Sequence, residues 1–447
     1  MKKYVVPLLI LHFTSFIFTS CSIQNKVSKS ATRFILKDSS LTAAHIGISI
    51  FDPATNKYWY NYQGDHYFIP ASNTKIPTCY AAMKYLGDSL AGVSKTENDT
   101  AVFIFPTADP TLLHPDFKNQ PVMEFLQKTR KKIYTTDITW QEQALGPGWS
   151  WNDYNESYMA ERSPMPVYGN LITWIQEKEN DEPAVIYSIP EINWEVNFDT
   201  TKGKYFSVVR NISENIYSVT ESGEKKKETE VPFATHGVKA TIELLSDTLR
   251  KTISALDPQV LQKLFSDARF HINVIHSQPT DSLLKPMMHR SDNFFAEQSL
   301  LMVSNHLLLG IMNDEKIIDT LLKTDFKNLP QKPRWVDGSG LSRYNLFSPQ
   351  DFVFIFNKMK NEFGMDRMKN ILPTGNEGTL NNYYKSEKGY IFAKTGSLSG
   401  VVSLSGFLYT KKNKLLIFSV LVNNSNSSST EVRRAVEKFI EGVYHNY

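Results

Sequence analysis

The clearest pattern of apolar and polar positions lies at the C-terminal end of the chain. Three apolar runs there predict strands, and they cover residues 390–394, 401–409 and 415–422. Apolar residues then recur at alternating spacings of three and one, which predicts a helix with one buried face. Ser428 and Glu431 have the spacing of a capping box at its start. This end of the chain therefore predicts an antiparallel sheet with a helix on one face.

The N-terminal third shows a similar alternation. Residues 45–51 and 58–62 predict a hairpin, and residues 72–86 predict a helix. Pro77 is expected to disturb the second turn of that helix, because proline lacks a backbone donor. Cys79 falls on the apolar side and is expected to be a core residue.

The middle of the chain is different. Residues 90–235 consist of short β-rich runs punctuated by proline and glycine, and helical patterns return at 238–249 and 293–309. We therefore expect one sheet-and-helix unit, built from both ends of the chain and interrupted by a large β-rich insertion.

Composition narrows the class of protein. The chain of 447 residues carries 49 Lys and Arg against 46 Asp and Glu, a net charge of +3 that does not indicate nucleic-acid binding. Two cysteines exclude a disulfide framework and a cysteine-rich zinc module, and the ten histidines form no metal-binding motif. We expect no metal and no cofactor.

The first twenty residues resemble an export signal. Lys2 and Lys3 precede a mostly apolar run over residues 5–18, which is shorter than the roughly 20 residues that a membrane-spanning helix needs. Cys21 follows small residues directly after this run, as at a bacterial lipoprotein cleavage site. The expectation is a signal peptide over residues 1–20 and a lipid anchor on Cys21. Ordinary cleavage that leaves a bystander thiol is the alternative.

A serine followed three positions later by a lysine occurs three times, at Ser72, Ser222 and Ser282. Ser72 is the one that opens a predicted helix, so Lys75 is expected one turn later on the same face, within reach of the Ser72 hydroxyl. A buried lysine with a lowered pKa can activate such a serine as a nucleophile.

Two further motifs carry polar groups. Ser291-Asp292-Asn293 precedes a predicted helix, and Lys394-Thr395-Gly396 ends a predicted strand. In the second motif glycine would let a substrate backbone lie along the strand, while the lysine and threonine offer a cation and a hydroxyl to a carboxylate. The lipase-like run Gly87-Asp88-Ser89-Leu90 is rejected because it lies at a helix end.

Together and in this order, the three motifs resemble the set of the penicillin-binding proteins and class A β-lactamases. Longer stretches sharpen the resemblance to class C low-molecular-mass penicillin-binding proteins, the type-4 D-alanyl-D-alanine carboxypeptidases and endopeptidases of the periplasm. The stretches cover residues 70–75, 108–112, 146–151, 289–297, 336–343, 377–380 and 393–398. Ser291 lies 216 positions after Lys75, which also favours this family because it carries an insertion there.

The resemblance implies a role for each matching residue. Ser72 resembles the nucleophile that attacks the carbonyl between two D-alanines, and Lys75 resembles its base. Ser291 looks like the hydroxyl that passes a proton to the leaving amine, and Asn293 like the amide that holds substrate backbone. Asp292 is expected to be structural.

The strand motif is assigned in the same way. Lys394 and Thr395 would bind the terminal carboxylate, with Gly396 leaving room for the substrate. The backbone N–H groups of Ser72 and Ser397 would form the oxyanion hole. Residues 337–343 and 378–380 are expected to be loops that shape the site.

The resemblance also implies an α+β fold of the penicillin-binding-protein and β-lactamase kind, an antiparallel sheet with flanking helices. The expected organisation is a catalytic domain built from residues 21–89 and 236–447, with the insertion at 90–235. Expected partners are peptidoglycan stem peptides, β-lactams and, through Cys21, a membrane. The oligomeric state stays open. A β-lactamase on the same frame is one alternative, although no deacylating glutamate can be assigned. A non-catalytic cell-wall protein is another.

Overall fold

The structure is a computed structural model that describes residues 24–179, 183–266 and 271–446. The expected signal peptide and Cys21 lie outside the described residues. Within those three ranges, no helix is both long and apolar enough to cross a membrane.

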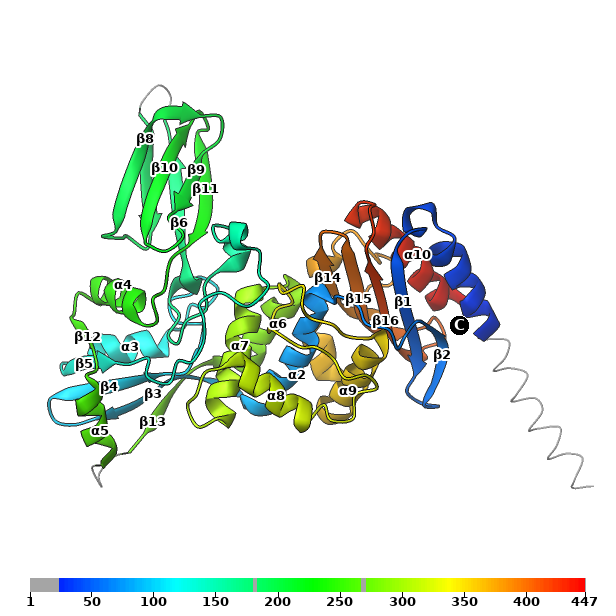
Figure 1. Ribbon diagram of the computed structural model, residues 1–447, viewed down its shortest axis with the longest axis horizontal. Helices are drawn as coiled ribbons and strands as arrows, with labels where there is room; N and C mark the ends of the chain where they lie inside the picture. The colour runs from blue at the N-terminus through cyan, green and yellow to red at the C-terminus, as the bar shows by residue number, and fades with distance from the viewer. Residues whose placement is uncertain (1–23, 180–182, 267–270, 447) are drawn as a thin grey trace, which may run out of the picture.

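A five-stranded antiparallel sheet joins the two ends of the chain (Figure 1). Its strand order is β14 (Ile391–Leu398), β15 (Val401–Tyr409), β16 (Leu415–Asn423), β1 (His45–Asp52) and β2 (Lys57–Tyr62). All five strands were predicted, and β14 continues past its predicted end at Lys394 to Leu398. The third sequence motif therefore lies inside an edge strand.

Two hydrophobic cores lie on opposite faces of this sheet. The first contains the α10 (Ser429–Asn446) stripe, together with Val27 and Ile35 from the N-terminal helical residues 24–36. The start of α10 carries the predicted capping box, because Ser428 and Glu431 each bond the other's backbone N–H. The second core contains helices α2 (Lys75–Tyr85), α6 (Thr280–His289), α7 (Asn293–Leu307), α8 (Asp314–Lys323) and α9 (Pro349–Ile371). Cys79 is fully buried in it, as predicted.

The helix predicted from Ser72 begins later than expected. Residues Ala71–Thr74 form a 3-10 turn, and α2 starts at Lys75. Pro77 therefore lies in the first turn of α2, where a missing N–H removes no helical hydrogen bond. The expected disturbance in the second turn is wrong for this reason.

Three additional sheets, drawn at the left of Figure 1, are built from the middle of the chain. The largest has the order β12 (Ile253–Ala255), β5 (Lys132–Thr135), β4 (Ala101–Pro106), β3 (Ser89–Glu97) and β13 (Asn273–Pro279). The others are β11 (Lys226–Pro232), β6 (Leu171–Glu177) and β7 (Val185–Ile189), and β8 (Glu195–Gly203), β10 (Ile216–Ser222) and β9 (Ser207–Arg210). Helices α3 (Pro121–Lys128), α4 (Lys239–Leu249) and α5 (Pro258–Ser266) accompany them.

The added sheets extend beyond the expected end of the insertion at residue 235. Strand β13 pairs with β3, and Leu244 and Leu245 of α4 share a core with Trp174 of β6. Helix α4 and strand β13, which both follow residue 235, therefore pack with the added sheets. The division into domains is otherwise still an interpretation.

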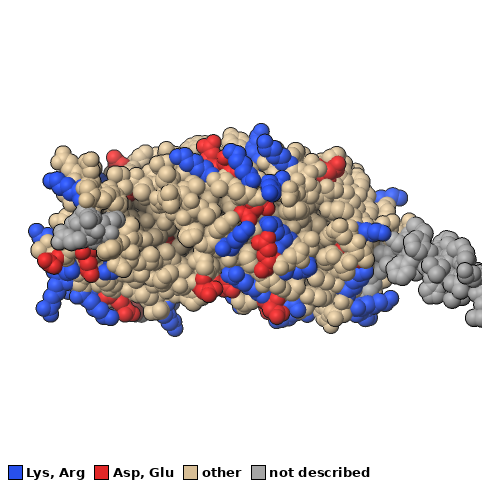
Figure 2. Space-filling model, turned by 90° about the horizontal axis from the view of Figure 1, so that it is seen from below, with Lys and Arg blue, Asp and Glu red and all other residues tan. Residues whose placement is uncertain are grey.

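Short 3-10 helices connect these elements, at Ser39–Leu41, Ala71–Thr74, Trp151–Asp153, Ser157–Met159, Tyr168–Asn170 and Gly378–Leu380. The face of the molecule in Figure 2 carries interspersed basic and acidic side chains across its middle. That face therefore presents no broad field of one sign.

Candidate active site

The first sequence motif forms a nucleophile and base pair. The Lys75 Nζ lies 3.1 Å from the Ser72 Oγ, 2.7 Å from the Asn293 Oδ1 and 2.7 Å from the Ser339 carbonyl oxygen. A neutral lysine has two N–H donors and one lone pair. The two shorter contacts satisfy the donors, so the lone pair is left to face the Ser72 hydroxyl. This arrangement suits proton abstraction from Ser72.

The surroundings of Lys75 favour its neutral form. Complete burial lowers the pKa of Lys75 to about 8, although the carboxylates of Asp337, Glu297 and Asp292 act to raise it. Because the ordinary lysine value is 10.5, the unprotonated fraction of this side chain near neutral pH is far larger than that of an exposed lysine, although the protonated form still predominates at pH 7. A lysine in this state can act as a general base.

The second and third motifs meet across the same cleft. The Lys394 Nζ donates to the Ser291 Oγ at 2.8 Å and to the Thr395 carbonyl oxygen at 2.7 Å. The Ser291 hydroxyl proton is consequently free to be donated elsewhere. Burial lowers the pKa of Lys394 well below its ordinary value, and the positive charges of Lys75 and Arg433 add to that effect. The negative charge of a bound substrate carboxylate would raise the pKa of Lys394 again and so offset both effects.

Asn293, from the second motif, contacts both the Lys75 side chain and the backbone of the insertion. Its Oδ1 accepts from Lys75, and its Nδ2 donates to the Tyr158 carbonyl oxygen at 2.9 Å. Asp292 caps α7 by accepting from the Phe295 N–H at 2.9 Å, which is the structural role expected of it. Backbone φ angles of +47° at Ala71 and +67° at Ser291 show that the chain is strained beside the nucleophile and at the second serine.

Strand β14 runs directly against the turn that carries Ser72. A Cβ atom at Gly396 would lie 2.9 Å from the Ser72 nitrogen and 2.8 Å from the Pro70 oxygen, so glycine is required for this approach. Ser72, Ser291, Asn293 and Ser397 all line one cleft. The backbone N–H groups assigned to the oxyanion hole thus come from adjacent segments.

The cleft also contains residues of the insertion. Its wall includes Trp149, Asp153, Tyr158 and Met159 from the insertion, and Gly340, Leu341 and Arg343 from the loop 337–343. The insertion therefore shapes the space above the nucleophile.

The loop 337–343 holds its shape through the buried Asp337. The carboxylate accepts from the N–H groups of Gly340 and Ser342, from the Asn345 side chain and from the Trp149 Nε1 at 3.0 Å. This loop supplies the Ser339 carbonyl that binds Lys75. The expected structural role of the loop is thus combined with direct contact to the base.

A buried charge cluster lies behind this loop. The Glu297 Oε1 accepts from the Ser339 N–H at 2.7 Å, and Arg162 of the insertion lies within 4 Å of Glu297, Glu142 and Asp314. Burial and the charge of Asp337 raise the pKa of Glu297, while Arg162 lowers it. Arg162 therefore connects the insertion electrostatically to the loop that holds Lys75.

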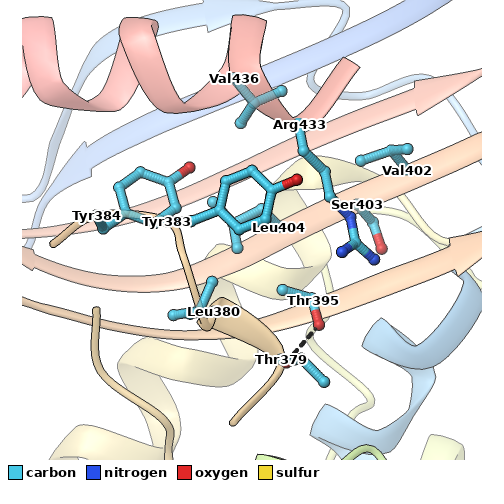
Figure 3. Close-up of a pocket in the computed structure, with 10 residues that line it drawn as sticks. All are labelled: Thr379, Leu380, Tyr383, Tyr384, Thr395, Val402, Ser403, Leu404, Arg433 and Val436. Carbon is cyan, nitrogen blue, oxygen red and sulfur yellow. Dashed lines mark hydrogen bonds between the residues drawn. The ribbon is translucent and has the colours of Figure 1, made fainter. Parts of the chain in front are cut away.

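The opposite face of β14 carries a second group of polar side chains (Figure 3). Thr395 and Ser397 share this face because side chains alternate along a strand. The Thr395 Oγ1 lies 2.7 Å from the Thr379 Oγ1, and Arg433 of α10 donates to the Ser397 Oγ at 2.7 Å. The Lys394 and Thr395 side chains therefore project from opposite faces of β14.

The structure brings the residues that the sequence assigned to the active site together around one cleft, except that the Thr395 side chain faces Thr379 on the other face of β14. Cys21 lies outside the described residues, and Ser222, a rejected candidate, bonds Gln176 in the insertion. Sequence reasoning missed Arg433, Arg162 and the carbonyl of Tyr158, since none belongs to a local motif. In the described ranges, no group of three or more His, Cys, Asp or Glu side chains could hold a metal ion.

Comparison with solved structures identifies the fold. The chain superimposes on the crystal structure of penicillin binding protein 4 (dacB) from Haemophilus influenzae with a TM-score of 0.70 and 21% identity, covering 94% of this chain and 98% of that one. The fold is therefore that of a penicillin-binding protein with additional β-rich sheets, as the sequence predicted.

Comparison of the sequence with known proteins identifies the family. The chain is 24% identical over 418 residues to the D-alanyl-D-alanine carboxypeptidase DacB of Haemophilus influenzae, covering 83% of this chain and 84% of the relative. It is also 24% identical over 438 residues to the D-alanyl-D-alanine carboxypeptidase of an Actinomadura species, covering 88% and 80%. The model of the D-Ala-D-Ala carboxypeptidase 3 (S13) family matches residues 29–443. The chain belongs to this family, and its predicted enzyme class, a serine-type D-Ala-D-Ala carboxypeptidase, is confirmed.

Proposed function

We propose that this protein cleaves the bond between two D-alanines in peptidoglycan stem peptides through an acyl-enzyme on Ser72. The observation that carries the proposal is the position of Lys75, whose Nζ lies 3.1 Å from the Ser72 Oγ while its donors bind Asn293 and Ser339. The same site would release a terminal D-alanine or would cleave a cross-bridge between two stem peptides.

In the proposed acylation step, Lys75 acts as the base and Ser291 as the acid. The Ser72 Oγ bonds to the substrate carbonyl carbon as its proton passes to the Lys75 Nζ, and the N–H groups of Ser72 and Ser397 receive the oxyanion. When the C–N bond breaks, the Ser291 hydroxyl gives its proton to the leaving amine. The proton on Lys75 then restores the Ser291 hydroxyl, and the amine leaves as free D-alanine.

Deacylation requires water, which enters after the amine has left. A β-lactam presents a strained amide and a carboxylate to the same groups, so Ser72 should open its ring. The opened ring stays attached and blocks the path of water. The Haemophilus influenzae relative has a structure complexed with a novel β-lactam, which supports this part of the proposal.

A labelling experiment tests the function. Wild-type protein should release D-alanine from acyl-D-alanyl-D-alanine and should form a penicillin adduct on the peptide containing Ser72 that lasts many minutes. Ser72→Ala should abolish both. Turnover of penicillin many times per second would identify a β-lactamase instead, and a Ser72→Ala variant that still labels would refute the assignment. Mass spectrometry of digested peptidoglycan fragments would separate carboxypeptidase from endopeptidase activity.

We further propose that the protein is exported, resides in the periplasm and is anchored to a membrane through a lipid on Cys21. The support is the sequence: an apolar run too short to span a bilayer, followed by small residues and a cysteine. Cys21→Ser should move the protein from the membrane fraction to the soluble fraction. Unchanged fractionation, with no lipid mass on the peptide containing Cys21, would refute the anchor.

A further inference from the structure

Arg433 occupies an unusual position for a residue outside every sequence motif. It projects from α10 toward the sheet (Figure 3), and its Nη2 donates to the Ser397 Oγ at 2.7 Å. It lines a small pocket together with Thr395 and Thr379. Its guanidinium therefore lies beside the hydroxyls on the outer face of the strand motif.

This guanidinium has no acidic partner among the described residues. Its neighbour Arg434 forms an ion pair with Glu437 at 2.5 Å, whereas Arg433 donates to the neutral Ser397 hydroxyl and lies over the Tyr383 ring, and its buried Nε has no hydrogen-bond partner. Half-buried charges are normally paired, because desolvating an unpaired charge is unfavourable. An anion bound at this point would complete the site.

The edge position of β14 determines where such an anion can lie. The outer edge of β14 is bridged to Thr374 at Phe392, but beyond Ala393 no strand of the described residues pairs with it, so an extended peptide can align along the motif itself. Lys394 can then contact the end of that peptide from one face of the strand. Thr395 and Ser397 can contact it from the other face. Because Arg433 donates to the Ser397 Oγ, the Ser397 hydroxyl proton is free to bind an anion.

We propose that Arg433 is a specificity-determining residue that binds the terminal carboxylate of the substrate, together with Thr395 and Ser397. This inference rests on the proposed function. Lys394 and Arg433 then hold the carboxylate from opposite faces of β14. Arginine suits this position, since its planar fork can bind a carboxylate and a hydroxyl at once.

The test compares two substrates that differ only in the charge at their C-terminus, acyl-D-alanyl-D-alanine and its C-terminal methyl ester. Arg433→Ala should lower kcat/KM for the free acid about ten- to a hundred-fold, the effect of removing one hydrogen bond to a charged group. It should leave kcat/KM for the ester within about two-fold. Arg433→Lys should recover part of the preference for the acid, because it restores the charge without the fork.

Arg434→Ala is the matched control, because Arg434 is adjacent on α10 and points to Glu437 and the Tyr383 ring. It should behave as wild type on both substrates. Equal losses on acid and ester in Arg433→Ala would overturn the inference, since they would indicate a purely structural contact to Ser397. If Arg433→Ala kept the wild-type preference for the acid over the ester, the inference would also be overturned, but the proposed function would not be contradicted. Wild-type protein that releases no D-alanine would overturn the proposed function and this inference with it.

Discussion

Trp149 and Asp337 are hydrogen-bonded across the boundary between the insertion and the catalytic unit, with the indole Nε1 3.0 Å from the carboxylate Oδ2. Asp337 is fully buried and shapes the loop whose Ser339 carbonyl binds Lys75. The insertion therefore takes part in holding the base, and its contribution can be measured.

Trp149→Phe should test this contact. The change keeps an aromatic ring but removes the N–H, leaving one lone pair of a buried carboxylate unsatisfied, which should lower the free energy of unfolding by about 1–3 kcal/mol. Denaturant titration would measure it. Trp151→Phe is the control: the Trp151 side chain is 74% exposed, so its replacement should change stability by less than about 0.5 kcal/mol. Equal stability of wild type and Trp149→Phe would contradict the role of the contact.

The pH dependence of acylation should report Lys75. Only the unprotonated amine can accept the Ser72 proton, so kcat/KM for penicillin labelling should rise with pH through an apparent pKa of about 8. Below that value the rate should fall about ten-fold per pH unit. Lys84→Met, a change on the same helix, should leave the midpoint in place. A rate that is flat between pH 6 and 9 would contradict the role of Lys75 as the base.

Lys394→Met should separate stability from function. Lys394 is a buried cation with no acidic partner in the described ranges, so an apolar side chain of similar length should leave the protein at least as stable, as thermal unfolding would show. Carboxylate binding would be lost, and kcat/KM for acyl-D-alanyl-D-alanine should fall about 100-fold or more. A variant that is destabilised but still labels at the wild-type rate would contradict both parts.

Arg162→Met should be strongly destabilising. The change leaves Glu297, Glu142 and Asp314 buried without their cation, and removing one partner of a buried pair typically lowers the free energy of unfolding by about 3–5 kcal/mol. The folded-state pKa values of Glu297 and Glu142, which burial already raises, would rise further above their unfolded values. The folded variant would then bind more protons than the unfolded chain, so its deficit should be larger at pH 8 than at pH 5. A deficit that does not depend on pH would contradict this explanation.

Much of the molecule follows from its sequence because the determining signals are local. Alternation of apolar residues predicted all five strands of the main sheet, and a spacing of three placed Lys75 beside Ser72. The capping box at Ser428 and the burial of Cys79 also follow from neighbouring residues. The three motifs, with the stretches around them, were enough to indicate the family.

Tertiary structure decided what depends on distant partners. The limit of the insertion depends on the pairing of β13 with β3, which no local pattern specifies because strand periodicity does not encode the partner strand. The start of α2 at Lys75 depends on how a proline fits the first turn. Arg433 belongs to an ordinary amphipathic helix, and it reaches Ser397 only because α10 packs over β14 and β15. The sequence alone therefore determined the elements and the chemical groups of the active site. The packing of those elements decided which cations and carbonyls surround them.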